Sequence, residues 1–155
     1  MSAPASGPLA AGVVAPDFPF EEGGKSMRLA MRCRDEGAFV LFLPLAGAPV
    51  CAADVRAIAA VAEKLGAPKR PLVLASVDRD AHLRRFLDEC GGASLIARGD
   101  PTLELAASYG VRRPEEFAAR ASFLIGRDGR VVGSAVHPIA FPRPLDVLLG
   151  WIASA

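Results

Sequence analysis

The chain has 155 residues, of which 52% are hydrophobic, and this is enough for one domain with a full core. Eighteen basic against seventeen acidic side chains leave it almost uncharged, and no basic run indicates a nucleic-acid partner. No segment approaches the roughly twenty apolar residues of a membrane span, and the first residues lack the features of a secretory signal, so we expect a cytoplasmic protein without a membrane partner.

The N-terminal half predicts alternating strands and helices. Residues 1–11, rich in Ala, Ser, Pro and Gly, predict a flexible lead-in, and residues 12–155 form the single domain, which begins with an extended segment. The apolar run 40–43 predicts a buried strand that Pro44 ends. From Cys51, apolar residues recur at helical spacing as far as Leu65, which predicts a helix.

The C-terminal half continues this pattern. We expect a strand over 72–77, a helix over 81–90, a short strand over 94–97, and a helix that Asp100 caps and Gly110 ends. The turn sequence GRDGR at 126–130 separates apolar runs over 121–125 and 131–136 and predicts an antiparallel hairpin before a last helix over about 144–152. The fold class is therefore α/β, a central mixed sheet with helices on both faces.

The three cysteines, Cys33, Cys51 and Cys90, are too few and too scattered for a secreted disulfide framework. No CxxC or Cys/His spacing indicates zinc, and we expect neither a metal nor another cofactor. Cys51 falls in the first turn of its predicted helix, where free backbone N–H groups and the helix dipole favour an anion. The thiolate is the nucleophilic form of cysteine, although a buried free cysteine is more often an inert hydrophobic residue.

The segment PLAGAPVC at 44–51 resembles the peroxidatic motif of the peroxiredoxins, the AhpC/TSA family. Further segments resemble the same family at 12–18, 72–78, 100–111 and 120–132, so that the resemblance covers nearly the whole chain. The arrangement is similar to the bacterioferritin comigratory protein and single-domain alkyl hydroperoxide reductase branches. The resemblance implies a thioredoxin-like fold.

It also implies a thiol peroxidase that reduces hydrogen peroxide or small organic hydroperoxides through a sulfenic acid on Cys51. Arg120 matches the family arginine that stabilises the thiolate and the leaving oxygen, and Pro44 matches the proline that shapes the site. The remaining pocket positions are Phe42, Ala48, Pro49 and Val50. Asp54 is interpreted as a helix-start acid stabilised by the helix dipole.

Ala48 departs from the family pattern, which has a hydroxyl residue at this position to bind the peroxide and the thiolate. The loss of one hydrogen bond to a charged group costs roughly 1.5 to 3 kcal/mol, so we expect a weakened peroxidase, with the Ser122 hydroxyl as a substitute donor. The alternative is a non-catalytic redox sensor or binding module of the same fold.

Two routes can reduce the oxidised cysteine. Cys90 is a candidate resolving thiol on the helix after the second strand, and the competing route uses an external thiol such as thioredoxin or a low-molecular-weight thiol. A disulfide between Cys51 and Cys90 would require both segments to move. Trp151 in the last helix packs either on the sheet or on a second subunit, which leaves a homodimer open.

Overall fold

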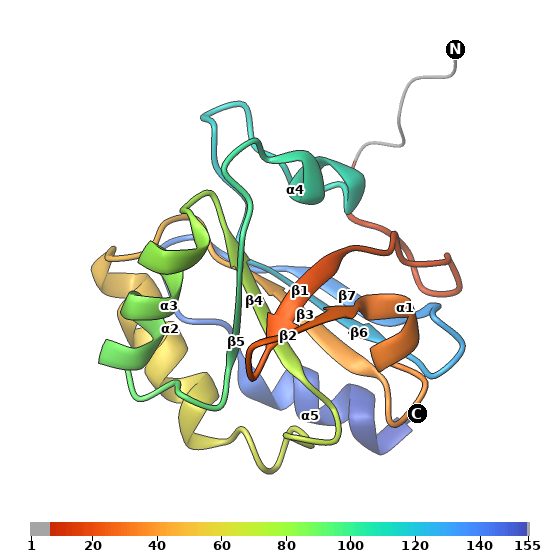
Figure 1. The fold of residues 1–155 in the computed structure, drawn as a ribbon. Coiled ribbons are helices and arrows are strands. Elements are labelled where there is room, and N and C mark those ends of the chain that lie inside the picture. The colour runs from red at the N-terminus through yellow and green to blue at the C-terminus, as the bar shows by residue number, and fades with distance from the viewer. Residues whose placement is uncertain (1–6, 155) are drawn as a thin grey trace.

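The computed structural model describes residues 7–154 and has a five-stranded sheet in the order β5-β4-β3-β6-β7 (Figure 1). The central strands β3 and β4 are parallel, β5 continues the parallel half, and β6 and β7 form the antiparallel half. The strands are β3 (Ala38–Phe42), β4 (Leu72–Ser76), β5 (Ile96–Gly99), β6 (Ala121–Ile125) and β7 (Val131–Val136). The predicted mixed sheet is therefore confirmed.

Helices cover both faces of the sheet, as predicted. Figure 1 shows α2, α3 and α5 on its left and lower side, and α1 and α4 on its right and upper side. The helices are α1 (Leu29–Arg32), α2 (Pro49–Ala60), α3 (Asp80–Glu89), α4 (Glu104–Ser108) and α5 (Leu145–Ser154).

Strand β3 separates the two halves of the core, because its side chains alternate between the faces. Phe39 and Leu41 belong to the cluster that α2, α3 and α5 cover. Val40 and Phe42 belong to the opposite cluster, in which Phe42 packs against Tyr109. All five residues of the strand are buried, which explains why its sequence is a continuous apolar run and not an alternating one.

Several element boundaries differ from the prediction. Helix α2 ends at Ala60, and turns replace its predicted last turn up to Leu65. Strand β5 begins two residues later than expected. Helix α4 begins only at Glu104, yet the Asp100 carboxylate still caps it by accepting from the backbone N–H groups of Leu105 at 3.1 Å and Ala106 at 2.9 Å.

The segment between the lead-in and β3 is more structured than predicted. It contains a hairpin of β1 (Pro19–Glu22) and β2 (Lys25–Arg28), followed by α1. Gly23 and Gly24 make the turn of this hairpin with φ of 58° and 79°, the left-handed geometry that suits glycine in a two-residue turn. Of the predicted flexible lead-in, residues 1–6 lie outside the described residues, whereas the Leu9 N–H donates to the Tyr109 carbonyl at 3.2 Å.

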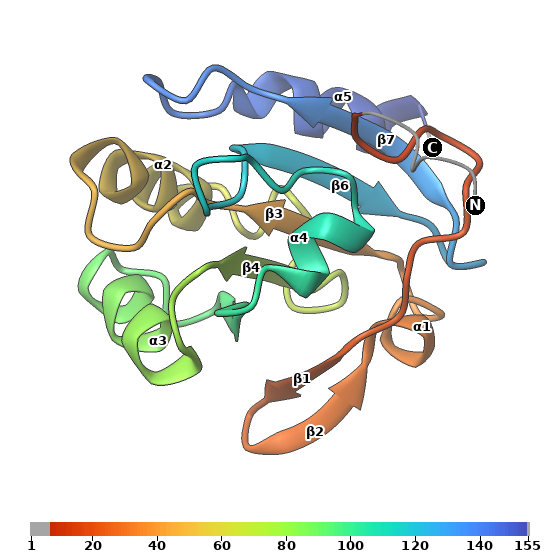
Figure 2. The same cartoon turned by 90° about the horizontal axis from the view of Figure 1, so that it is seen from above.

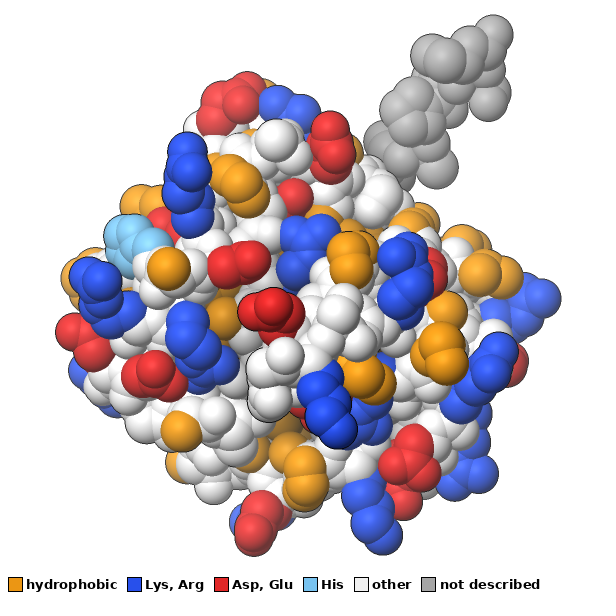
Figure 3. Space-filling model, in the orientation of Figure 1, with side chains coloured by type: hydrophobic (Ala, Val, Ile, Leu, Met, Phe, Trp, Pro, Cys, Tyr) orange, Lys and Arg blue, Asp and Glu red, His pale blue; other side chains and the backbone are white. Residues whose placement is uncertain are grey.

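The molecular surface matches the balanced composition. Figure 3 shows basic and acidic side chains interspersed over the face that it presents. Within residues 7–154, no helix is long and apolar enough to cross a membrane. The same described residues contain no group of three or more His, Cys, Asp or Glu side chains placed to hold a metal ion.

The last residue of β3 and the first residue of β6 lie side by side, at the end of the sheet where its parallel strands have their carboxyl ends. Phe42, the last residue of β3, pairs with Ala121, the first residue of β6. Because the two strands are antiparallel, the segment that follows β3 and the residue that precedes β6 meet at this end of the sheet. This pairing brings Cys51 and Arg120 together although 69 residues separate them in sequence.

Candidate active site

Cys51 lies in the first turn of α2, with 1% of its surface exposed. Helix α2 begins at Pro49, a residue that suits the first helical position because it has no N–H to leave unpaired. The residue before it, Ala48, has an extended backbone with φ −67° and ψ 138°, and within the described residues its side chain caps no backbone group. Peptide N–H groups at this helix start are therefore free to face an anion.

The turn that leads to Cys51 is anchored on strand β4. The Asp78 carboxylate accepts hydrogen bonds from the Ala46 N–H and the Ser76 hydroxyl, each at 2.7 Å. The Leu43 N–H donates to the Ala75 carbonyl at 2.8 Å. Since one point of the turn is tied to β4 and another to Asp78 just after that strand, the sheet fixes the position of the helix start.

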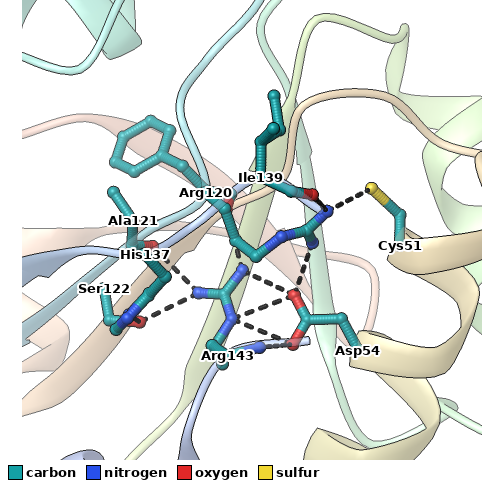
Figure 4. A network of polar contacts seen from close by, with 9 residues as sticks. Cys51, Asp54, Arg120, Ala121, Ser122, His137, Ile139 and Arg143 are labelled. Atoms are coloured by element: carbon teal, nitrogen blue, oxygen red, sulfur yellow. Dashed lines mark hydrogen bonds and ion pairs between the residues drawn. The ribbon is translucent and has the colours of Figure 1, made fainter. Parts of the chain in front are cut away.

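Arg120 is buried beside Cys51 and points its guanidinium at the sulfur (Figure 4). Its Nη2 lies 3.4 Å from the Cys51 Sγ and donates at 3.1 Å to the Ile139 carbonyl, while its Nη1 donates at 2.8 Å to Asp54 Oδ2. Among the buried side-chain nitrogen and oxygen atoms of the described residues, only Arg120 Nε has no hydrogen-bond partner. A guanidinium held in this way presents fixed donors to a thiolate and to an oxygen bound next to it.

Asp54 is fully buried and joins two guanidinium groups. Besides Arg120, it binds Arg143, whose Nε and Nη2 lie 3.0 and 2.9 Å from Oδ2 and whose backbone N–H donates to Oδ1 at 3.1 Å (Figure 4). Burial alone would raise the pKa of Asp54, but the charge and hydrogen bonds of Arg143, together with Arg120, hold it below its usual value. The interpretation of Asp54 as an acid serving the helix dipole is thus wrong, because its carboxylate points into the buried network.

The buried network carries unequal charge. Arg120 and Arg143 contribute two positive charges, whereas Asp54 contributes one negative charge, and all three side chains are at most 3% exposed. Buried charge is costly unless an opposite charge compensates it. A thiolate at Cys51, in contact with Arg120, would supply the second negative charge.

Arg143 connects this network to Ser122 and His137. Its Nη1 donates to the Ser122 hydroxyl at 3.0 Å, and the same hydroxyl lies 2.8 Å from His137 Nε2. Ser122 thus binds Arg143 and His137 instead of supplying the hydroxyl that Ala48 lacks. His137, for which the sequence suggests no partner, acquires one here.

The other predicted pocket residues surround the turn, with one exception. Pro44 is buried two residues after the end of β3, Ala48 and Val50 are half-buried, and Pro49 is exposed at the start of α2. The ring of Phe42 lies instead on the opposite face of the sheet, with its centroid 5.6 Å from that of Tyr109. Phe42 reaches the network only through its carbonyl, which accepts from Arg143 Nη2 at 2.8 Å.

Cys90 lies away from Cys51. Helices α2 and α3 both follow the carboxyl ends of parallel strands, so they begin at the same edge of the sheet and run side by side in the same direction (Figures 1 and 2). Cys51 is in the first turn of α2 and Cys90 is the C-cap of α3. The ten residues of α3 span about 15 Å, whereas disulfide-bonded Cα atoms lie about 6 Å apart.

Neither of the other cysteines has an environment that activates a thiol. All three cysteines are free. Burial raises the pKa of both Cys33 and Cys90, and the charges of Arg34 and Arg56 respectively offset this only in part. Both thiols are consequently poorer nucleophiles than an unperturbed cysteine.

Sequence reasoning missed Arg143 as part of the site. It stands in the irregular segment between β7 and α5 and contacts Asp54 across 89 residues of chain. The one signal available was composition, because a single arginine stands among apolar residues and prolines in the sequence AFPRPL at 140–145.

Comparison with known proteins agrees with the fold. Residues 11–134 match the family described as AhpC/TSA. The chain is similar to the reduced 2-Cys peroxiredoxin of Plasmodium vivax, with 23% identity over 94% of this chain and 81% of that chain and a TM-score of 0.81. It is also similar to the peroxidoxin BcpB of Mycobacterium tuberculosis, with 20% identity, 94% and 97% coverage and a TM-score of 0.80.

The AhpC of Enterococcus faecalis is a third similar structure, with 18% identity over 95% of this chain and 92% of that chain and a TM-score of 0.80. No curated protein matches the chain in sequence. The structural matches confirm the predicted thioredoxin-like fold.

Proposed function

The chain belongs to the AhpC/TSA family of thiol peroxidases, and from this premise we propose that Cys51 is the peroxidatic nucleophile, acting on hydrogen peroxide or small organic hydroperoxides. The observation that carries the proposal is the contact between Arg120 Nη2 and the Cys51 sulfur at 3.4 Å, inside a buried network that is otherwise positively charged.

In the proposed reaction the Cys51 thiolate attacks the terminal oxygen of the hydroperoxide. An S–O bond forms while the O–O bond breaks, the cysteine is oxidised to a sulfenic acid, and the leaving alkoxide or hydroxide takes a proton to become an alcohol or water. The negative charge moves from sulfur to the leaving oxygen, and Arg120 Nε, which has no partner among the described residues, is a donor that can follow it.

The cycle requires a thiol that reduces the sulfenic acid. A first thiol forms a mixed disulfide with Cys51 and releases water, and a second thiol reduces that disulfide. Geometry favours an external thiol, such as thioredoxin or a low-molecular-weight thiol, over Cys90, because α3 would have to unfold before Cys90 reached Cys51. We place this chemistry in the cytoplasm, where such thiols are abundant.

Ala48 favours a second candidate function. Without a hydroxyl at this position the bound peroxide loses one hydrogen-bond partner, and slow turnover would suit a peroxide sensor or binding module better than a scavenging enzyme. The two candidates share Cys51 oxidation and differ in its rate.

The test is to mix reduced protein with one equivalent of peroxide and trap sulfenic acid with a dimedone-type probe, followed by mass spectrometry of each cysteine. We expect labelling of Cys51 that is rapid compared with Cys33 and Cys90, and no such phase in Cys51→Ser. Labelling of Cys51 no faster than of free cysteine would reject peroxidase catalysis. A Cys51 to Cys90 crosslink would reject the external-thiol route.

A further inference from the structure

His137 ends a continuous series of polar contacts that begins at the Cys51 sulfur (Figure 4). Each link is a contact of 3.4 Å or less between side chains that are at most 7% exposed. The members, in order, are Cys51, Arg120, Asp54, Arg143, Ser122 and His137. The chemistry proposed above uses the first part of this series and assigns no role to its end.

The donors in this series have a defined direction. Arg143 can only donate, so the Ser122 hydroxyl accepts from its Nη1 and keeps its own proton free for another acceptor. His137 Nε2, at 2.8 Å, is that acceptor, provided that the imidazole is neutral with its proton on Nδ1. The main chain fixes the ring nearby, because the His137 N–H donates to the Arg120 carbonyl at 2.7 Å.

The surroundings of His137 favour this neutral form. Burial lowers the pKa of His137 to about 4, and the positive charges of Arg143 and Arg120 act in the same direction. Asp54 is the one charged group there that opposes the shift. At neutral pH the imidazole is therefore an acceptor.

We propose that His137 is a positioning residue of the Cys51 site. By accepting a hydrogen bond from the Ser122 hydroxyl, His137 orients Ser122 toward Arg143. Arg143 in turn holds the Asp54–Arg120 pair against the Cys51 sulfur. The inference rests on the proposed function, because its effect is on the oxidation of Cys51. Protonated His137 can no longer accept the hydrogen bond from the Ser122 hydroxyl, and its positive charge is added close to that of Arg143. Cys51 oxidation should then slow in acid through a step that belongs to His137.

The experiment measures the rate of sulfenic acid formation on Cys51 with hydrogen peroxide, from neutral pH to below the His137 pKa of about 4. In His137→Gln the side-chain amide oxygen can still accept from Ser122 but does not titrate, so we expect the wild-type rate at neutral pH without the acid step. In His137→Leu the acceptor is lost, and we expect oxidation about threefold to tenfold slower at neutral pH. Glu63→Gln is the matched control, because it places glutamine at an exposed position after α2 and should leave the whole profile unchanged.

A double-mutant cycle separates positioning from a general structural effect. If His137 acts through Ser122, then His137→Leu slows oxidation far less in a Ser122→Ala background than in the wild-type background. Equal effects in both backgrounds would overturn the inference, as would an unaltered acid profile in His137→Gln. Should His137→Leu fail to fold, the profile of His137→Gln decides alone. Absence of Cys51 oxidation in the wild-type protein would instead reject the proposed function, and this inference with it.

Discussion

Asp54 is the residue on which both buried guanidinium groups converge. Its carboxylate binds Arg143, which lies between β7 and α5, and Arg120, which immediately precedes β6. Arg120 in turn contacts the Cys51 sulfur. Removing one member of a buried charge network leaves the others uncompensated, which typically costs 3–5 kcal/mol. The arrangement therefore ties the orientation of Arg120 to the stability of the fold.

Ala48 is the position at which a substitution is expected to increase the rate of Cys51 oxidation. We predict that Ala48→Thr increases the rate of Cys51 oxidation by peroxide about tenfold or more, because the new hydroxyl can donate to the thiolate or the bound peroxide. Stopped-flow oxidation with hydrogen peroxide measures this rate. Ala53→Thr, at an exposed position of the same helix, is the control. An unchanged rate in Ala48→Thr would mean that the missing hydroxyl does not limit the reaction.

At the scale of secondary structure, the packing of α5 on β7 explains the place of Trp151. A Cβ added at Gly133 in β7 would lie 2.5 Å from the Trp151 ring, so the ring packs on the sheet at a position that only glycine leaves free. The sequence left open whether Trp151 packs on the sheet or on a second subunit, and the structure shows that it packs on the sheet.

We predict that Gly133→Ala lowers the free energy of unfolding by about 1 to 3 kcal/mol, because the methyl group would overpack this contact. Gly150→Ala is the matched control in α5, since a Cβ at this position meets no atom within 4 Å. The substitution also removes a glycine from the interior of a helix. We expect it to stabilise the protein by up to about 1 kcal/mol. Urea unfolding of both variants measures the difference, and a neutral Gly133→Ala would contradict the tight contact.

The elements that the sequence predicts well are those with strong local patterns. The hairpin of β6 and β7 has the predicted bounds, because apolar runs flank a turn sequence. The β1–β2 hairpin was missed because its strands have only four residues each and β2 is mostly exposed, which leaves little hydrophobic pattern. Helix α2 ends early because apolar spacing alone does not mark where turns take over.

The site was predictable only where motif and local structure coincide. Cys51 and Arg120 are named by the resemblance, and Cys51 also by its place at a helix start. The links from Arg143 to Asp54 and from His137 to Ser122 join segments 89 and 15 residues apart, and no local pattern predicts such pairs. The His137–Ser122 contact depends on the register of β7 with β6, whereas Arg143 reaches Asp54 on α2 from the irregular segment after β7, and only the folded chain defines these positions.

For the whole molecule, buried His137 makes stability depend on pH. Its folded-state pKa of about 4 lies below its ordinary value of 6.5, so the unfolded chain binds this proton first as the pH falls. The contribution of His137 to stability is therefore largest above about pH 6.5 and is lost toward pH 4, by up to about 3 kcal/mol.

We predict that His137→Gln removes this part of the decline. Chemical unfolding at a series of pH values gives the slope of the free energy of unfolding against pH for each protein. The contribution of the carboxylates is common to both proteins and cancels in the difference between the two slopes. Parallel slopes across this range would show that His137 titrates alike in the folded and unfolded states.

The most direct test of the central claim is the charge state of the Cys51 sulfur, measured as thiolate ultraviolet absorbance of the reduced protein at neutral pH. We predict close to one thiolate per chain in the wild-type protein, its loss in Cys51→Ser, and a clear decrease in Arg120→Met. Cys90→Ser should keep the wild-type absorbance. A wild-type spectrum at neutral pH that Cys51→Ser leaves unchanged would show that the sulfur beside Arg120 is a neutral thiol, and it would contradict the account.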